Sequence, residues 1–227
     1  MKKVIFTLLM VAFASVSFAQ ENAETKPWTT KGTVGLNFSQ SSFTNWAAGG
    51  QNALNWIGTL NYQANYAKNG FKWDNTLSTS LGYSYFNFKD KPIKTDDKIE
   101  LTSLAGLKAT EKLNYSLELA FRSQFANGFD YEVDSTHRIS KFLAPGYITL
   151  GIGAEWVPNK YFSLNFAPIT GRVTIVSDSL LAENGAYGVE AGKHARYEFG
   201  ARLVAKLDVP IAENISFNSK LELFSNI

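Results

Sequence analysis

The side chains best suited to acid–base chemistry are two histidines and a small set of aspartates. They are His137, His194, Asp96, Asp97, Asp130 and Asp134. An imidazole beside a carboxylate can act as a general base in a hydrolase or an acyltransferase. Solvated loops often bring such residues together without any catalytic role. We therefore assign no catalytic residue, and we keep a hydrolase or acyltransferase using loop His and Asp residues as the alternative function.

The other reactive residues match no metal or nucleotide motif. The chain has no cysteine, which excludes disulfides, Cys-based zinc sites and a thiol nucleophile. It has no glycine-rich phosphate loop and no helical two-histidine spacing. The acids around Asp130, Asp134 and Asp178 fit no calcium loop, although they could bridge lipopolysaccharide through divalent ions. We expect no cofactor and no metal site.

The chain begins with the pattern of an export signal. Residues 1–19 start with two lysines, continue with an apolar stretch and end with Ser17 and Ala19 in a small-residue cleavage site. The stretch is too short for a membrane anchor and has no stop-transfer charge cluster. We predict a signal peptide over 1–19, cleavage before Gln20, and a polar periplasmic leader over 20–31.

Charge and hydropathy exclude two broad classes. The chain has 22 basic and 20 acidic residues, so removal of Lys2 and Lys3 with the signal leaves 20 of each. This balance argues against nucleic acid as a partner. Mean hydropathy is -0.13, and no apolar run of spanning length follows residue 18, which excludes a bundle of membrane helices.

The elements that position these residues are strands, because apolar and polar residues alternate along the mature chain. Between 113 and 125 one parity holds Leu113, Tyr115, Leu117, Leu119, Phe121 and Phe125, and the other holds Asn114, Ser116, Glu118, Arg122 and Gln124. A helix would mix these charges into its apolar stripe. The same reasoning predicts nine strands, at about 32–42, 52–67, 71–88, 97–110, 113–126, 143–156, 161–177, 196–209 and 214–227.

Strand length and loop length favour a membrane barrel. Each strand exceeds the ~5–6 residues usual in soluble sheets and reaches the ~9–11 residues of a tilted membrane strand. Short connections at 68–70, 111–112, 157–160 and 210–213 alternate with longer ones at 43–51, 89–96, 127–142 and 178–195. This alternation is typical of short periplasmic turns and longer extracellular loops.

The two faces differ in chemistry. Aromatic residues cluster near strand ends, where they would lie at lipid headgroups. Charges of both signs share the other face, and we predict that they face a lumen because a Lys or Arg at the bilayer midplane costs roughly 2–4 kcal/mol. These are Lys72, Asp74, Glu100, Lys108, Glu118, Arg122, Glu155, Arg172, Glu198, Arg202, Lys206, Asp208, Lys220 and Glu222. A soluble sandwich or lipocalin-like barrel shows the same alternation and is the alternative fold.

Two irregularities stand out in this pattern. The apolar parity changes within the seventh strand at 167–171, where a proline and a glycine predict a bulge. Nine strands also break the even count of bacterial barrels. We therefore expect ten or more strands in a complete barrel and C-terminal truncation at Ile227.

The first long loop is unusually apolar for an exposed connection. It contains Phe43 and Trp46, followed by Ala47-Ala48-Gly49-Gly50. We predict that Phe43 and Trp46 either fold over the barrel mouth as a partial plug or contact an outer-membrane partner protein.

Several segments together resemble a known family. They are the motif NFSQSSFTNWAAGG from Asn37 to Gly50, KTDDK at 94–98, FLAP at 142–145, APITG at 167–171, NGAYG at 184–188 and LFSN at 223–226. The chain is similar to domain-of-unknown-function family 3078, the signal-peptide-bearing outer-membrane β-barrel proteins of Bacteroidota. The resemblance implies an outer-membrane location and no assigned activity. Family members continue through further strands, which agrees with the expected truncation.

These observations predict an all-β protein, an antiparallel up-and-down transmembrane β-barrel over 32–227, porin-like and located in the cell outer membrane. We expect a passive narrow channel or a structural, scaffolding barrel, with outer-membrane lipid and lipopolysaccharide as its surroundings. The sequence specifies no solute, no partner identity and no oligomeric state.

Overall fold

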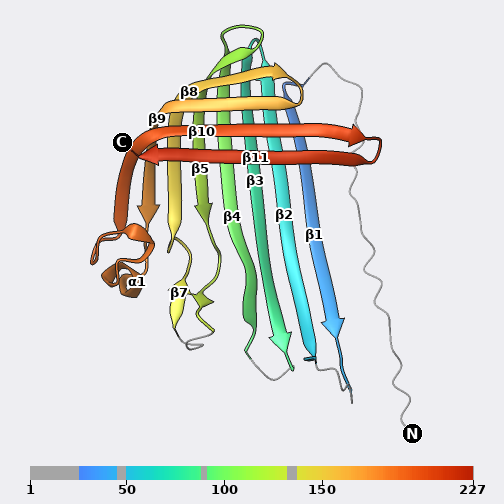
Figure 1. Cartoon of the computed structure of the whole chain (residues 1–227), viewed down its shortest axis with the longest axis vertical. Helices are drawn as coiled ribbons and strands as arrows, with labels where there is room; N and C mark the ends of the chain where they lie inside the picture. Colours follow the sequence, from blue (N-terminus) through green and yellow to red (C-terminus); the bar gives the residue numbers. More distant parts are fainter. Residues whose placement is uncertain (1–25, 45–49, 88–90, 132–136, 227) are drawn as a thin grey trace.

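Alternation of apolar and polar residues produces strands along nearly all of the chain described by the computed structural model, which covers residues 26–44, 50–87, 91–131 and 137–226. Nine strands form one antiparallel sheet in the order β1-β2-β3-β4-β5-β8-β9-β10-β11 (Figure 1). Their bounds are β1 Trp28–Ser41, β2 Ala53–Lys68, β3 Phe71–Phe86, β4 Ile93–Lys108, β5 Leu113–Ser123, β8 Gly146–Asn159, β9 Phe162–Ile175, β10 Ala195–Ala212 and β11 Ile215–Asn226. The all-β prediction is confirmed.

The predicted tight turn between the second and third strands is present. β2 ends at Lys68 and β3 begins at Phe71, and the two residues between them, Asn69 and Gly70, have φ angles of 52° and 77°. Positive φ at both central residues is the signature of a type I′ hairpin, which Asn-Gly favours.

The long connections contain small elements that the alternation did not predict. β6 (Gly128–Phe129) and β7 (Arg138–Ser140) form a separate two-stranded sheet, and the helices α1 (Ser179–Glu183) and η1 (Ala186–Gly188) follow β9. A small apolar cluster made of Ala144, Val176, Leu181, Ala182 and Val189 packs these loops together. No helix in the described ranges has the length and apolarity needed to cross a bilayer.

The predicted bulge in β9 is confirmed by the pairing on both of its sides. The register with β8 shifts between Ile152 and Ala154, and the register with β10 shifts between Gly200 and Arg202. Because one extra residue reverses the side-chain parity, one face of β9 carries the buried residues Asn165, Ala167, Thr170 and Thr174.

The sheet curls but does not close within the described residues. β1 pairs only with β2, and β11 pairs only with β10. In Figure 1, β8, β9 and β10 bend partway along their length, and β10 and β11 run across the front of β1–β4 instead of alongside β1. The predicted closed barrel is therefore not observed in this structure.

Two strands begin earlier than predicted. β1 starts at Trp28 and not at 32, so the last residues of the predicted leader pair with β2, from Trp28 opposite Tyr66 onward. β4 starts at Ile93 and not at 97, with a register shift against β3 near Tyr83. The signal peptide predicted over 1–19 lies outside the described residues.

Candidate functional site

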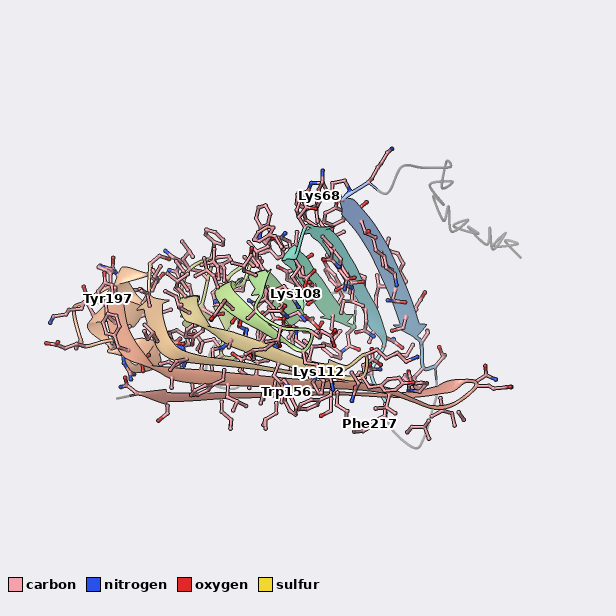
Figure 2. The ribbon with its side chains drawn as sticks, turned by 90° about the horizontal axis from the view of Figure 1, so that it is seen from above. Lys68, Lys108, Lys112, Trp156, Tyr197 and Phe217 are labelled. Atoms are coloured by element: carbon pink, nitrogen blue, oxygen red, sulfur yellow. The ribbon has the colours of Figure 1, made fainter. Side chains whose placement is uncertain are left out.

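The two faces of the sheet have opposite chemistry, and the candidate site is the polar one. We call the face that carries Glu118, Asn165 and Arg202 the inner face, and the opposite face the outer face. Glu118 and Arg202 are 7% and 5% exposed, whereas Leu117, adjacent to Glu118, is 46% exposed. Figure 2 looks onto the rim of short turns and shows the sheet curled around the inner side.

Arg202 is the most extensively paired charge of the inner face. Its Nη1 lies 2.6 Å from Oε2 of Glu118, and its Nη2 lies 3.1 Å from Oε1 of Glu222. Glu118 belongs to β5 and Arg202 to β10, so the pair crosses the two intervening strands β8 and β9. An ion pair that links non-adjacent strands holds the curl of the sheet.

A hydrogen-bonded chain supports this pair. Asn165 donates from Nδ2 to Oε2 of Glu118 over 3.2 Å, and its Oδ1 accepts from Oγ of Ser116 over 3.1 Å. All three residues are buried. Because a buried charge is costly unless its lone pairs are satisfied, this chain fixes the carboxylate of Glu118 in its ion-paired position.

A second ion pair also crosses the inner face. Lys72 of β3 pairs with Glu155 of β8, and two strands lie between them. A Cβ placed at Gly106 would lie 2.8 Å from Cε of Lys72. The absence of a side chain at Gly106 therefore lets the lysine lie flat across β4 towards its partner.

The other charges predicted for a lumen are only partly brought together. Glu100 pairs with Arg122 at 2.9 Å and with Lys98 at 3.5 Å. Lys220 pairs with Glu222 at 3.3 Å, and Glu198 pairs with Arg196 at 2.7 Å. The guanidinium of Arg172 lies 4.0 Å from the ring centroid of Phe224. Asp74 is half-buried, whereas Lys108, Lys206 and Asp208 are exposed.

A cavity of about 340 Å³ opens on the inner face beside these pairs. Its charged lining residues are Glu100, Arg122, Arg172, Arg202, Lys220 and Glu222. Cations outnumber carboxylates in this lining, although the ion pairs above already engage both carboxylates. The space is small, and its charged groups are held in ion pairs, except Arg172, which lies over the ring of Phe224.

The outer face is apolar and exposed over many strands. Large exposed side chains on it include Val34, Tyr115, Leu117, Leu119, Leu150, Ile152, Phe166, Ile169, Tyr197 and Phe199. Soluble monomers rarely expose contiguous apolar surface larger than a few hundred Å². This distribution of polar and apolar residues is inverted with respect to a soluble sandwich, in which the apolar face forms the core.

Aromatic rings lie at both ends of the outer face. Near the short turns, the ring of Trp28 lies 5.2 Å from Tyr66 and 5.7 Å from Trp73, and Trp156 lies 6.0 Å from Phe162. Near the long loops, the rings of Trp56 and Tyr83 lie 5.5 Å apart. Leucines such as Leu77 and Leu81 occupy β3 between the two groups.

The two loop histidines of the alternative acid–base function both lie in the described residues. Nδ1 of His194 lies 2.7 Å from the carbonyl oxygen of Val176, so this ring nitrogen contacts the main chain. His137 is exposed, and its carbonyl oxygen accepts from the backbone N–H of Asp130. Asp134 lies outside the described residues.

The pair Asp96-Asp97 has a structural role. Asp97 accepts hydrogen bonds from the backbone N–H groups of Phe125 at 2.7 Å and Ala126 at 2.9 Å, and pairs with Lys94 at 2.8 Å. Asp96 accepts from the hydroxyl of Ser80. These contacts fix the chain where β5 ends, so the motif at 94–98 stabilises a loop.

Asp178 holds several contacts in the loop after β9 that were not predicted from the sequence. It accepts from the backbone N–H groups of Leu180 and Leu181 at the start of α1, and pairs with Arg138 at 3.1 Å and Lys141 at 3.4 Å. Burial alone would raise the pKa of Asp178, but these hydrogen bonds and cations lower it below its ordinary value. The sequence signal for this cap is an aspartate two residues before the short apolar run Leu180-Leu181-Ala182.

The first loop is described only in part. Phe43 is 40% exposed, and its backbone N–H donates to Oδ1 of Asn52 over 2.6 Å. Trp46 lies outside the described residues. The two predicted roles of this loop, closing the barrel mouth or contacting a partner protein, therefore stay predictions.

In the described ranges no three His, Asp or Glu side chains gather in a way that could hold a metal ion.

Comparison with known proteins adds one finding. Residues 38–129 match the model of a family described as a protein of unknown function (DUF3078). The matched stretch covers less than half of the 227 residues, and it contains Asp97 and Glu118 but not Arg202. No curated protein and no solved structure matches the chain.

Proposed function

We propose that this chain is a member of that family and an outer-membrane β-barrel protein of Bacteroidota, exported by a cleaved signal peptide, with a passive role as a narrow channel or a structural barrel. The observation that carries the proposal is the inverted polarity of the sheet. Charged side chains such as Glu118 and Arg202 are buried on the inner face, while Leu117 and Phe199 are exposed on the outer face. Hydrocarbon is the solvent that favours this arrangement.

The separation of the aromatic groups supports a bilayer of ordinary thickness. Trp73 and Tyr83 lie on the outer face of β3, ten residues apart in the sequence. At ~3.3 Å per residue this spans roughly 33 Å along the strand. A strand tilt of about 40° reduces it to roughly 25 Å along the membrane normal, which equals the typical height of the apolar band of such barrels.

The paired inner charges favour a filled interior over a wide pore. Two ion pairs, Arg202 with Glu118 and Lys72 with Glu155, cross the inner face. Side chains that bridge the inside of a small barrel occupy its lumen. A passive barrel needs no catalytic group, and the contact of His194 with a main-chain carbonyl does not support the enzyme alternative.

Membrane insertion requires both edges of the sheet to be paired. Each unsatisfied backbone group in hydrocarbon costs several kcal/mol, so an open strand edge is not stable there. The proposal therefore includes pairing partners for β1 and β11 in the membrane, because each of these strands is paired on one side only in the described residues. The first loop, with Phe43 at its start, is the candidate contact for an outer-membrane partner protein.

Location is tested by expressing the full chain in a Gram-negative host and separating the outer membrane by density. We expect the protein in the outer-membrane fraction, resistant to carbonate extraction and migrating faster in gels when unheated, as folded barrels do. Recovery of the folded protein in the soluble periplasmic fraction would exclude a membrane barrel.

The state of the interior is tested by conductance across planar lipid bilayers. We expect the wild-type protein to pass little or no current, and the double substitution E118A/R202A to raise the current because it removes the pair that crosses the inner face. The exposed loop substitution K91A is the matched control and leaves the current unchanged. A large stable wild-type current would contradict a filled interior.

A further inference from the structure

The rim formed by the short turns carries lysines on neighbouring connections. Lys68 ends β2, Lys108 ends β4, Lys112 precedes β5, and Lys160 lies in the turn after β8; all four side chains are exposed. Figure 2 labels Lys68, Lys108 and Lys112 along the curled edge of the sheet. The acids Glu111 and Glu213 also lie in short turns, and the four lysines outnumber them.

The turns of this rim are joined by backbone hydrogen bonds, so the lysines belong to one continuous surface. The backbone N–H of Lys108 donates to the carbonyl oxygen of Gly70 over 2.8 Å, which ties the turn between β4 and β5 to the turn between β2 and β3. The backbone N–H of Val157 donates to the carbonyl oxygen of Lys112 over 2.8 Å and ties β8 to the turn between β4 and β5. The backbone N–H of Asp208 donates to the carbonyl oxygen of Tyr161 over 2.8 Å and continues the rim to β10.

Aromatic side chains of the outer face lie directly beside this rim. Trp28, Phe71, Trp73 and Trp156 are 38–45% exposed, and Tyr115 is 65% exposed. The ammonium group of Lys160 lies 4.9 Å from the ring centroid of Tyr161. From the turns towards the strand centres the order is therefore lysine, aromatic ring, aliphatic side chain. Phosphate, glycerol and acyl chain follow one another in the same order in a phospholipid.

We propose that this rim, called the lysine rim and defined by Lys68, Lys108, Lys112 and Lys160, binds the headgroups of anionic phospholipids. The inference rests on the proposed membrane location and adds the orientation of the protein. The short turns face the leaflet that holds anionic phospholipids, and each exposed ammonium group pairs with a phosphate while the aromatic rings lie at the glycerol level.

The tryptophans provide the measurement, because three of them, Trp28, Trp73 and Trp156, lie next to the lysine rim. The refolded full chain is reconstituted into phosphatidylcholine vesicles in which brominated phosphatidylglycerol or brominated phosphatidylcholine is exchanged for the unlabelled lipid. Bromine quenches tryptophan at contact distance, so the two quenching curves give the relative affinity of the rim for each headgroup.

We expect quenching by both lipids, with brominated phosphatidylglycerol favoured roughly two- to fivefold at low salt and the preference lost at high salt, because exposed charges are screened. The variant K68Q/K112Q is expected to lose most of the preference. The variant K91Q/K193Q removes the same charge from exposed lysines on the long loops and is expected to keep it.

The outcomes separate the two proposals. Equal quenching by both lipids places the chain in the bilayer and refutes the lysine rim. Quenching by neither lipid refutes the membrane location itself. An equal loss of preference in both variants would show that total charge and not the rim attracts the lipid. The salt titration on the wild-type protein decides the question if K68Q/K112Q does not refold.

Discussion

Arg202 shows at the scale of one residue what holds the inner face together. Its guanidinium is 5% exposed and contacts two carboxylates, those of Glu118 and Glu222. Desolvating such charges is costly, and their mutual attraction offsets the cost only while both signs are present. Removal of Arg202 alone is therefore more damaging than removal of Arg202 and Glu118 together.

Substitution of Arg202 by Met should destabilise the fold by about 3–5 kcal/mol, because it leaves Glu118 buried without a cation. We expect E118M/R202M to recover part of this loss, since no charge is then left buried at these two positions, although the buried amide of Asn165 loses its acceptor. Urea unfolding of the refolded protein in detergent micelles measures both values.

The control for this pair is the exposed ion pair of Lys193 with Glu190, whose side chains are 62% and 72% exposed. K193M should change the free energy of unfolding by less than about 1 kcal/mol. If R202M is as mild as K193M, the inner face is solvated and the ion pair has no structural role.

Asp178 has the corresponding role in the loops, and its lowered pKa gives a pH dependence. Because the folded-state pKa lies below the ordinary value of 3.8, ionised Asp178 stabilises the loop structure above that value, and the stabilisation is lost as the pH falls through the lowered pKa. We expect the amides of Leu180 and Leu181 to lose hydrogen-exchange protection in that acidic window, after correction for the intrinsic exchange rate.

The variant D178N separates the cap from the charge. Asparagine still caps a helix, but it cannot pair with Arg138 and Lys141, so we expect a loss of about 1.5–3 kcal/mol of local protection at neutral pH and no further loss on acidification. E183Q, on the exposed side of the same helix, is the control. Unchanged protection in D178N would mean that the ion pairs do not order this loop.

At the scale of the element, the bulge in β9 depends on a glycine in the neighbouring strand. A Cβ at Gly153 would lie 2.0 Å from the carbonyl oxygen of Phe166 and 2.5 Å from Cα of Ala167. β8 can therefore pass the bulge only without a side chain at this position. The register of β8 with β9 shifts at this position, between Ile152 and Ala154.

The substitution G153A should destabilise the fold by about 1–3 kcal/mol, in the range of overpacked cores, or shift the register of β8. G58A is a matched control, because the nearest atom to a Cβ at Gly58 is 3.9 Å away. Thermal unfolding in micelles compares the two variants, and an equal effect of both would show that β8 does not need a glycine opposite the bulge.

The strands were predictable because a repeat of two residues is a local signal. The alternation gave nine strands, and the Asn69-Gly70 turn and the β9 bulge were equally local. The start of β1 at Trp28 was missed because the polar residues 29–31 join the strand through pairing with β2, which lies far away in the sequence. The contacts of Asp178 with Arg138 and Lys141 are also long-range, and no spacing in the sequence encodes them.

The sequence predicts which charged residues lie on the inner face, but it does not predict which of them pair with one another. Parity places Glu118 and Arg202 on one face, yet it does not say that they meet across two intervening strands. That contact depends on the curl of the sheet, and the β9 bulge beside Gly153 is a long-range feature of that kind, because it needs a glycine on the neighbouring strand. Closure into a barrel was the prediction that the described structure did not reproduce.

For the whole molecule, membrane insertion depends on which solvent covers the outer face. The chain has no cysteine, so single nitroxide labels can be attached at introduced cysteines without background. β5 is the best strand to scan, because it is central in the sheet and alternates between exposed and buried residues from Tyr115 to Leu119.

The most direct measurement is the accessibility of these labels to oxygen, which concentrates in hydrocarbon, and to a water-soluble nickel complex in reconstituted vesicles. Labels at Tyr115, Leu117 and Leu119 should be reached by oxygen and not by nickel, while labels at Ser116 and Ala120 should be shielded from oxygen. Nickel contact at Leu117 and Leu119 equal to that of a label in the exposed loop at Lys91 would contradict the membrane assignment.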